Sequence, residues 1–184
     1  MAFAQLIDTK YLFDTTIIPN NVDTNILNPF IREAQVMYIK NVLGTQLYTK
    51  LMNDVIAGGS TGKYLELMNN WVAPAQAKWT LWLALPFIWT RISNKSLVKK
   101  DSDNSTPVGE NEMELLLGRI QSSAEYYCEE VRKFILENSQ SFPEYFTNSS
   151  FDTKPSNDIY NCGIYTGKGL NDDYRRYNGY YSRK

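Results

Sequence analysis

Hydrophobic positions in the first part of the chain recur at helical spacing, in segments that turn residues separate. The first such segment predicts a helix over 24–42, which Asp23 or Thr24 can cap. Gly44 then favours the end of this helix, and a second apolar stripe predicts a helix over 45–57. After the loop sequence GGSTG, a short third helix is expected over 63–70.

The run WTLWLALPFIW at 79–89 is apolar at every position except Thr80. A helix without a polar face is buried on all sides or spans a membrane, and this run is far shorter than the roughly 20 residues that a span needs. We therefore predict a buried fourth helix that has Pro74 in its first turn, a kink at Pro86 and an end near Ile92. Its surplus aromatic surface suggests contact with a neighbouring subunit.

A polar, turn-rich segment over 93–107 predicts a loop or an irregular hairpin, and the last long helix then begins near Gly109. The apolar positions of this helix alternate spacings of four and three over about three heptads, which is typical of a helix that lies along others in a bundle. They are Met113, Leu117, Ile120, Ala124, Tyr127, Val131 and Phe134. The sequence thus predicts an all-α fold, a bundle of about five helices. Its expected core includes Leu27, Ile31, Leu47, Leu51, Trp79, Leu83, Phe87, Leu117, Ile120 and Val131.

Beyond the last helix the periodicity disappears, and we divide the chain into a helical domain over 1–146 and an extended arm over 147–184. The arm is rich in tyrosine, asparagine and glycine, and cannot bury enough surface to order by itself. Tyrosines offer a large contact area at low entropic cost, so we expect the arm to order on a partner. Its candidate partner-binding residues are Tyr160, Tyr165, Tyr174, Arg175, Arg176, Tyr177, Tyr180 and Tyr181.

Composition argues against a catalytic role. The chain has no histidine, which excludes Ser-His-Asp, Cys-His and His-ligated metal sites. Its 19 basic and 20 acidic residues leave a net charge of -1, so no overall field favours nucleic acid or membrane. The N-terminus has no basic region of a signal peptide, and both cysteines are expected as thiols. We expect no enzymatic activity, cofactor, metal or membrane association.

Two local features have competing explanations. GGSTGKY resembles a phosphate-binding loop, but that motif requires glycine at Ala57 and serine or threonine at Tyr64, so an interhelical turn is favoured. A basic patch surrounds the expected hairpin, and it is either a solvated loop or a docking site for an acidic neighbour or the DNA backbone. The patch consists of Arg91, Lys95, Lys99 and Lys100.

Several strings, in this order, resemble the head–tail connector (adaptor or neck-ring) proteins of tailed phages, closest to those of Bacteroidetes and crAss-like phages. They are NNVDTNILNPFIREAQVMYIKNVLGTQLYTKLMNDV, then ALPF, RISNKSLVKKDSDNSTP and FPEY. The resemblance covers residues 20–146 and includes no catalytic signature. The arm lies outside it.

The resemblance implies a structural virion protein, made in the bacterial host cytoplasm, that forms a dodecameric ring in the neck between head and tail. Such a ring would bind the portal protein and other neck or tail proteins, and genomic DNA would pass through its lumen without sequence-specific binding. An alternative from another class is a host-directed intracellular binding module that uses the tyrosine-rich arm. A third is a nucleic-acid-binding protein, for which the balanced charge is poor support.

Overall fold

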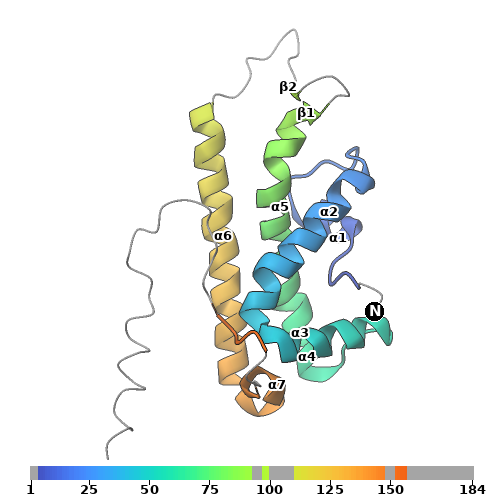
Figure 1. The fold of residues 1–184 in the computed structure, drawn as a ribbon, viewed down its shortest axis with the longest axis vertical. Coiled ribbons are helices and arrows are strands. Elements are labelled where there is room, and N and C mark those ends of the chain that lie inside the picture. The colour runs from blue at the N-terminus through green and yellow to red at the C-terminus, as the bar shows by residue number, and fades with distance from the viewer. Residues whose placement is uncertain (1–3, 93–96, 100–109, 148–151, 157–184) are drawn as a thin grey trace, which may run out of the picture.

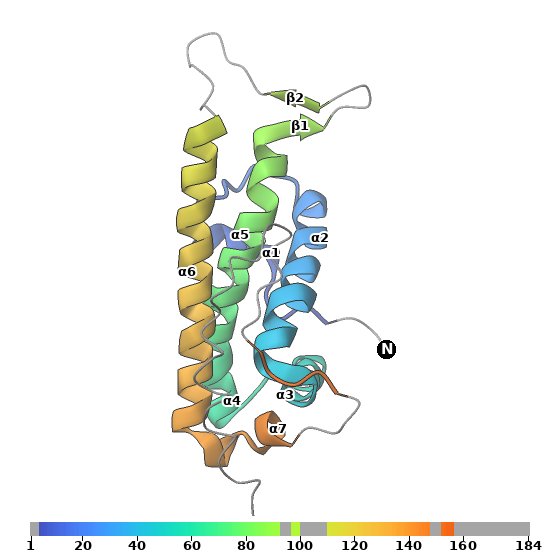
Figure 2. The ribbon, with the colours of Figure 1, turned by 60° about the vertical axis from the view of Figure 1, so that its left-hand side comes forward.

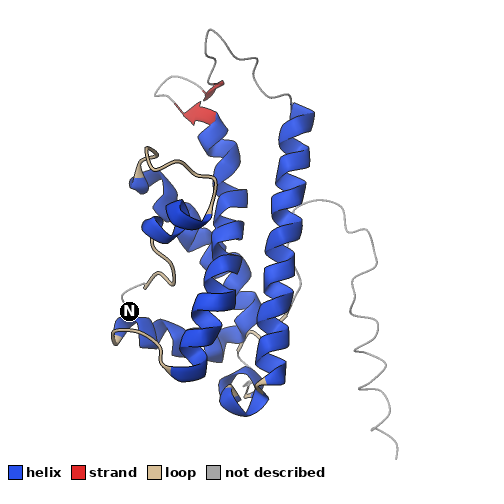
Figure 3. Cartoon of the chain, turned by 180° about the vertical axis from the view of Figure 1, so that it is seen from behind, coloured by secondary structure: helices blue, strands red, loops and turns tan. Residues whose placement is uncertain are grey.

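The computed structural model describes residues 4–92, 97–99, 110–147 and 152–156. These residues form an elongated helical bundle with one short two-stranded hairpin, which confirms the predicted all-α class (Figures 1 and 3). The helices that the sequence predicts correspond to α2, α3, α4, α5 and α6, and the short α1 and α7 are additional. The helices are α1 (Thr9–Thr15), α2 (Thr24–Ala34), α3 (Lys40–Ile56), α4 (Gly62–Leu67), α5 (Ala73–Trp89), α6 (Glu110–Glu137) and α7 (Pro143–Phe146).

A π-helical turn joins α2 to α3, and Gly44 interrupts α3 further along the chain. Asp23 caps α2, because its side chain accepts a hydrogen bond from the backbone N–H of Asn25 at 2.9 Å. The π turn, Gln35–Ile39, leads directly into α3. Gly44 interrupts α3 with φ 72° and ψ 164°, a conformation that is essentially restricted to glycine. The predicted stop between two helices is thus present as a sharp break.

The predicted third and fourth helices form one continuous helical path. A second π-helical turn, Met68–Val72, connects α4 to α5 without a loop. Helix α5 begins at Ala73, so Pro74 lies in its first turn, as the sequence predicts. The wide turn ends at Val72, two residues before this proline, whose ring nitrogen cannot donate the usual helical hydrogen bond, and the helical path continues through the proline.

The hairpin follows α5 immediately. Strands β1 (Thr90–Ile92) and β2 (Leu97–Lys99) are antiparallel, with Thr90 opposite Lys99 and Ile92 opposite Leu97. The predicted fourth helix thus ends at Trp89, not near Ile92, because residues 90–92 pair with a second strand. Of the two predicted possibilities for this segment, a loop or a hairpin, the described residues form the hairpin.

Helix α5 is the central helix of the bundle, and α2 and α6 flank it (Figures 1 and 2). Its fully buried Trp79 stacks on Tyr38 from the first π turn, with ring centroids 3.8 Å apart and planes 2° from parallel. The indole N–H of Trp79 donates to the Cys128 thiol of α6 at 3.2 Å. One aromatic side chain therefore contacts the elements on both sides of α5.

Most of the predicted core is buried, but Phe87 is not. Its side chain is 47% exposed and its ring lies 5.0 Å from that of Phe30, at the end of α5 next to the hairpin. The expectation that α5 is buried on all sides is therefore wrong for the single chain. Leu83 and Leu117, also predicted as core, are half-buried. The remaining predicted core residues, Leu27, Ile31, Leu47, Leu51, Trp79, Ile120 and Val131, are buried.

The buried positions of α6 follow the spacing of a straight helix more closely than they follow a repeat of seven residues. Its buried positions are Ile120, Ala124, Cys128, Val131 and Ile135, whereas two positions of the predicted seam, Tyr127 and Phe134, are half-buried. A straight helix has 3.6 residues per turn, so its buried stripe drifts away from a strict repeat of seven. No helix among the described residues is both long and apolar enough to cross a membrane.

Candidate functional site

The basic patch of the hairpin is described only in part. Arg91 lies in β1 and Lys99 in β2, but the register places Arg91 opposite Val98 and Lys99 opposite Thr90. The two basic residues are therefore not cross-strand partners. The other two, Lys95 and Lys100, lie outside the described residues.

The predicted contact residues of the arm also lie outside the described residues. They are Tyr160, Tyr165, Tyr174, Arg175, Arg176, Tyr177, Tyr180 and Tyr181. Within the arm the structure describes Thr147 and residues 152–156, and we name residues 152–156 the C-terminal strap.

The C-terminal strap lies along the break in α3. The backbone N–H of Thr45 donates to the carbonyl of Thr153 at 3.1 Å, and the N–H of Thr153 donates to the hydroxyl of Thr45 at 3.1 Å. Further along, the N–H of Ser156 donates to the carbonyl of Asn41 at 2.8 Å. The strap thus binds backbone groups that the break at residue 44 leaves free of helical partners. This part of the predicted arm belongs to the helical body.

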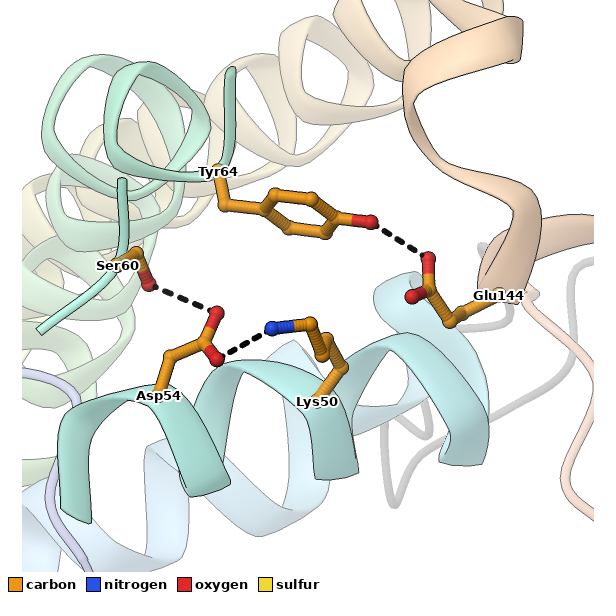
Figure 4. Close-up of polar contacts among 5 residues, drawn as sticks. All are labelled: Lys50, Asp54, Ser60, Tyr64 and Glu144. Carbon is orange, nitrogen blue, oxygen red and sulfur yellow. Dashed lines mark hydrogen bonds and ion pairs between the residues drawn. The ribbon is translucent and has the colours of Figure 1, made fainter. Parts of the chain in front are cut away.

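A polar cluster ties the region before the strap to α3 and α4 (Figure 4). The phenol of Tyr64 donates to a carboxylate oxygen of Glu144 in α7 at 2.8 Å. Lys50 pairs with Asp54 one turn along α3, and its ammonium nitrogen lies 5.0 Å from the centre of the Tyr64 ring. The hydroxyl of Ser60 donates to the other oxygen of Asp54 at 3.4 Å. Sequence reasoning missed this cluster, because Tyr64 and Glu144 are 80 residues apart.

The polar cluster holds α7 against α4 through the hydrogen bond between Tyr64 and Glu144. Burial raises the pKa of Tyr64 to about 12, and the hydrogen bond to Glu144 and the nearby carboxylates act in the same direction. Tyr64 therefore stays protonated at neutral pH and acts as a hydrogen-bond donor. Among the described residues, no group of three or more Cys, Asp or Glu side chains is placed to hold a metal ion.

A second polar cluster is buried at the centre of the bundle. Gln35, in the first π turn, accepts hydrogen bonds from the N–H of Leu6 at 3.0 Å and from the amide of Gln76 at 3.2 Å. Its own amide donates to the carbonyl of Ala4 and to the Tyr48 hydroxyl, both at 3.0 Å. Gln35 is fully buried, so it connects the N-terminal segment to α3 and α5 inside the bundle.

The Cys128 thiol is buried against α5. Burial raises its pKa to about 11, although the hydrogen bond from Trp79 opposes the shift. A thiolate is the nucleophilic and metal-binding form of cysteine, and this thiol stays protonated at neutral pH. Cys128 is thus a buried free thiol, in line with the expectation from the sequence that it is a thiol. Cys162 lies outside the described residues.

Exposed apolar side chains gather on the two helices that flank α5. On α6 they include Leu115, which is 68% exposed, and Tyr126, which is 59% exposed. Where α2 passes into the first π turn, Val36 and Met37 are 43% and 38% exposed. A shallow, open depression lies at each place. The sequence stripes that located the buried faces did not single out these outer faces.

Comparisons with known proteins identify the family and nothing more specific. No curated protein and no solved structure matches the chain. The model of a family of unknown function, DUF6712, matches residues 39–155. The matched region extends from the end of the first π turn to Pro155 in the C-terminal strap, and thus includes both the break in α3 and the segment that covers it. The chain belongs to the DUF6712 family.

Proposed function

We propose that this protein is a structural virion protein, a head–tail connector ring that joins the portal of a tailed phage to the tail and forms part of the DNA channel. The sequence strings quoted above, which resemble connector proteins, support the proposal. So does the helical architecture with a basic hairpin at one end of the bundle. In this proposal the protein works without catalytic turnover or a cofactor, in the virion neck.

The observation that carries the proposal is the pair of exposed faces on opposite flanks of the central helix. A ring needs a head-to-tail interface, in which one surface of a subunit binds a different surface of the next. Leu115 and Tyr126 on α6, and Val36 and Met37 beside α2, supply apolar side chains on two such surfaces. Interface cores are enriched in aromatic residues and methionine, and Tyr126 and Met37 are residues of these two types.

The hairpin and the distal arm have roles of their own in this proposal. The tyrosines and arginines after residue 156 bind a neighbouring subunit or another neck protein, and the arginines contact carboxylates of that partner. The hairpin, with Arg91 and Lys99, meets an acidic surface of the portal or the backbone of the DNA in the lumen.

The mass of the full chain in solution, with and without the portal protein, tests the proposal. We expect a closed oligomer of defined mass, or its formation when the portal ring is added. A chain that stays monomeric and does not bind the portal would contradict the proposal. Stoichiometric binding of a host protein through the arm would instead support the alternative, a host-directed binding module. Binding to DNA of any sequence that weakens steeply with salt would favour a nucleic-acid-binding protein.

A further inference from the structure

The outer face of α6 carries a regular stripe of exposed residues. Leu115, Arg119, Ser122 and Tyr126 follow each other at spacings of four, three and four, so they lie on one side of the helix, opposite to its buried positions. Gly118 lies at the edge of this stripe, within the same shallow depression. A Cβ atom added at Gly118 would meet no heavy atom within 4 Å in the single chain. The face is therefore open and able to accept side chains from outside.

The outer face of α2 carries a stripe of the same spacing. Pro29, Glu33 and Val36 are four and three residues apart, and all three are exposed. They line the second shallow depression together with Met37. Aligned from their N-terminal ends, the first stripe reads Pro29 and Glu33 on α2 and Val36 in the π turn that follows, and the second reads Leu115, Arg119 and Ser122 on α6.

Charge makes the two stripes complementary at their middle position. Glu33 on α2 and Arg119 on α6 are both exposed, and neither forms an ion pair with another residue that the structure describes. One step earlier in the stripes, the apolar Pro29 would face the apolar Leu115. One step later, the small Ser122 would face Val36. A second copy of this chain is therefore the occupant that matches each stripe in both spacing and charge.

The direction of the helices allows this pairing in a ring. Helices α2 and α6 run in the same sense along the bundle (Figure 2). Rotation about an axis along the bundle keeps that sense, so α6 of one subunit would lie parallel to α2 of the next. Parallel packing brings the two aligned stripes together in the same order.

We propose that the α6 stripe of one copy packs against the α2 stripe of the next copy, with Arg119 paired to Glu33 at the centre of the interface. This inference rests on the proposed function and names the contact that builds the ring. Because the two surfaces differ, the contact is head-to-tail, and it closes into a ring or extends as a filament.

Charge reversal tests this contact directly. The variants Arg119→Glu and Glu33→Arg each set like charges against each other, and either alone should raise the protein concentration for half-assembly at least about tenfold. An equimolar mixture of the two variants restores an opposite pair at every contact, so the mixture should assemble again. The variant that carries both changes should also assemble. Matched reversals at the exposed Lys10 and Glu137 should leave assembly unchanged.

A steric variant gives a second, independent measurement. Gly118→Phe has room in the single chain and replaces a glycine inside a helix, so the monomer should stay folded and keep its thermal stability or gain some. In the aligned stripes Gly118 lies level with Arg32, next to Glu33 of the next copy, so the new ring would occupy space that α2 of that copy needs, and assembly should fail. Sedimentation velocity over a range of concentrations measures assembly, and circular dichroism verifies the fold.

The outcomes separate this inference from the proposed function. Suppose that the parent chain assembles. If the charge-reversal variants then assemble as well as their controls, the contact is wrong while the ring stands. The same conclusion holds if the equimolar mixture of the two variants fails to assemble. If the parent chain stays monomeric at every concentration, the contact is also overturned, and binding to the portal still tests the function. If the charge swap works but the assembly binds no portal, the contact stands and the connector function fails.

Discussion

Pro155 occupies the space that a side chain at Gly44 would need. A Cβ atom added at Gly44 would lie 2.8 Å from both Cγ and Cδ of Pro155, which is closer than such atoms approach each other in proteins. The two residues are far apart in the sequence, yet they pack where the C-terminal strap passes over the break in α3. The break and the strap therefore form one structural unit.

Gly44→Ala should destabilise the fold for two separable reasons. The backbone of residue 44, at φ 72° and ψ 164°, costs a residue with a side chain about 1–3 kcal/mol, and the new methyl group also collides with Pro155. The free energy of unfolding, measured with urea, should therefore fall by at least about 2 kcal/mol. Adding Pro155→Gly should recover the part due to the collision and leave the backbone part. An unchanged unfolding midpoint for Gly44→Ala would contradict the observed packing.

Two truncations should separate the strap from the rest of the arm. Deleting 157–184 keeps every described contact of the strap, so the free energy of unfolding should stay the same. Deleting 148–184 also removes the hydrogen bonds of Thr153 and Ser156 to α3, and should cost about 1–2 kcal/mol while the body stays folded. Both truncations should impair particle assembly, because both remove the tyrosines that we expect to bind a partner. Normal numbers of infectious particles from the shorter deletion would contradict the proposed role of the arm.

Gln35→Leu should destabilise the bundle although it introduces an apolar side chain into a buried position. The substitution leaves the buried N–H of Leu6 without its acceptor, and such an unpaired polar group costs about 1–3 kcal/mol. It also removes one of the two acceptors of the Gln76 amide, which keeps the carbonyl of Ile31. The double variant Gln35→Leu with Gln76→Leu removes that partly paired amide as well. It should therefore lose less stability than the sum of the two single variants, as chemical denaturation would measure. Simple additivity would show that the two amides do not interact.

The raised pKa of Tyr64 predicts a loss of stability at alkaline pH. The folded state holds the phenol proton up to about 12, whereas the unfolded chain releases it near 10.0. The contribution of Tyr64 is complete below pH 10 and is lost as the pH rises through about 12. Tyr64→Phe should lose less stability than the parent over that interval, measured by urea unfolding at a series of pH values. Glu144→Gln, which keeps an acceptor but removes the charge, should lower the Tyr64 pKa. Identical pH dependence in all three proteins would contradict the assigned hydrogen bond.

The helices were predictable because their buried faces are periodic. Ile120 and Val131 belong to a stripe that any straight helix against a core must show, and Asp23 is a residue type that caps helices. Phe87 was misjudged for a physical reason. Apolar residues mark a potential interface, but they do not say whether this chain or another one covers it.

The strap and the buried amides could not be predicted in the same way. The strap is held by backbone hydrogen bonds and one proline, and neither leaves a periodic pattern in the sequence. Gln35 follows Ala34 on the buried side of its helix, so its position carried a weak signal, but its polarity pointed to solvent. The π-helical turn that places its side chain in the core has no composition that would indicate it.

A reconstruction of the virion in which we propose this chain as the head–tail connector tests the central claim most directly. We expect density for the helical bundle, repeated around the portal–tail axis as a closed ring directly below the portal, with α2 and α6 of adjacent copies in contact. Density for this bundle away from that axis, or a particle that lacks it, would contradict the account of this protein as a head–tail connector.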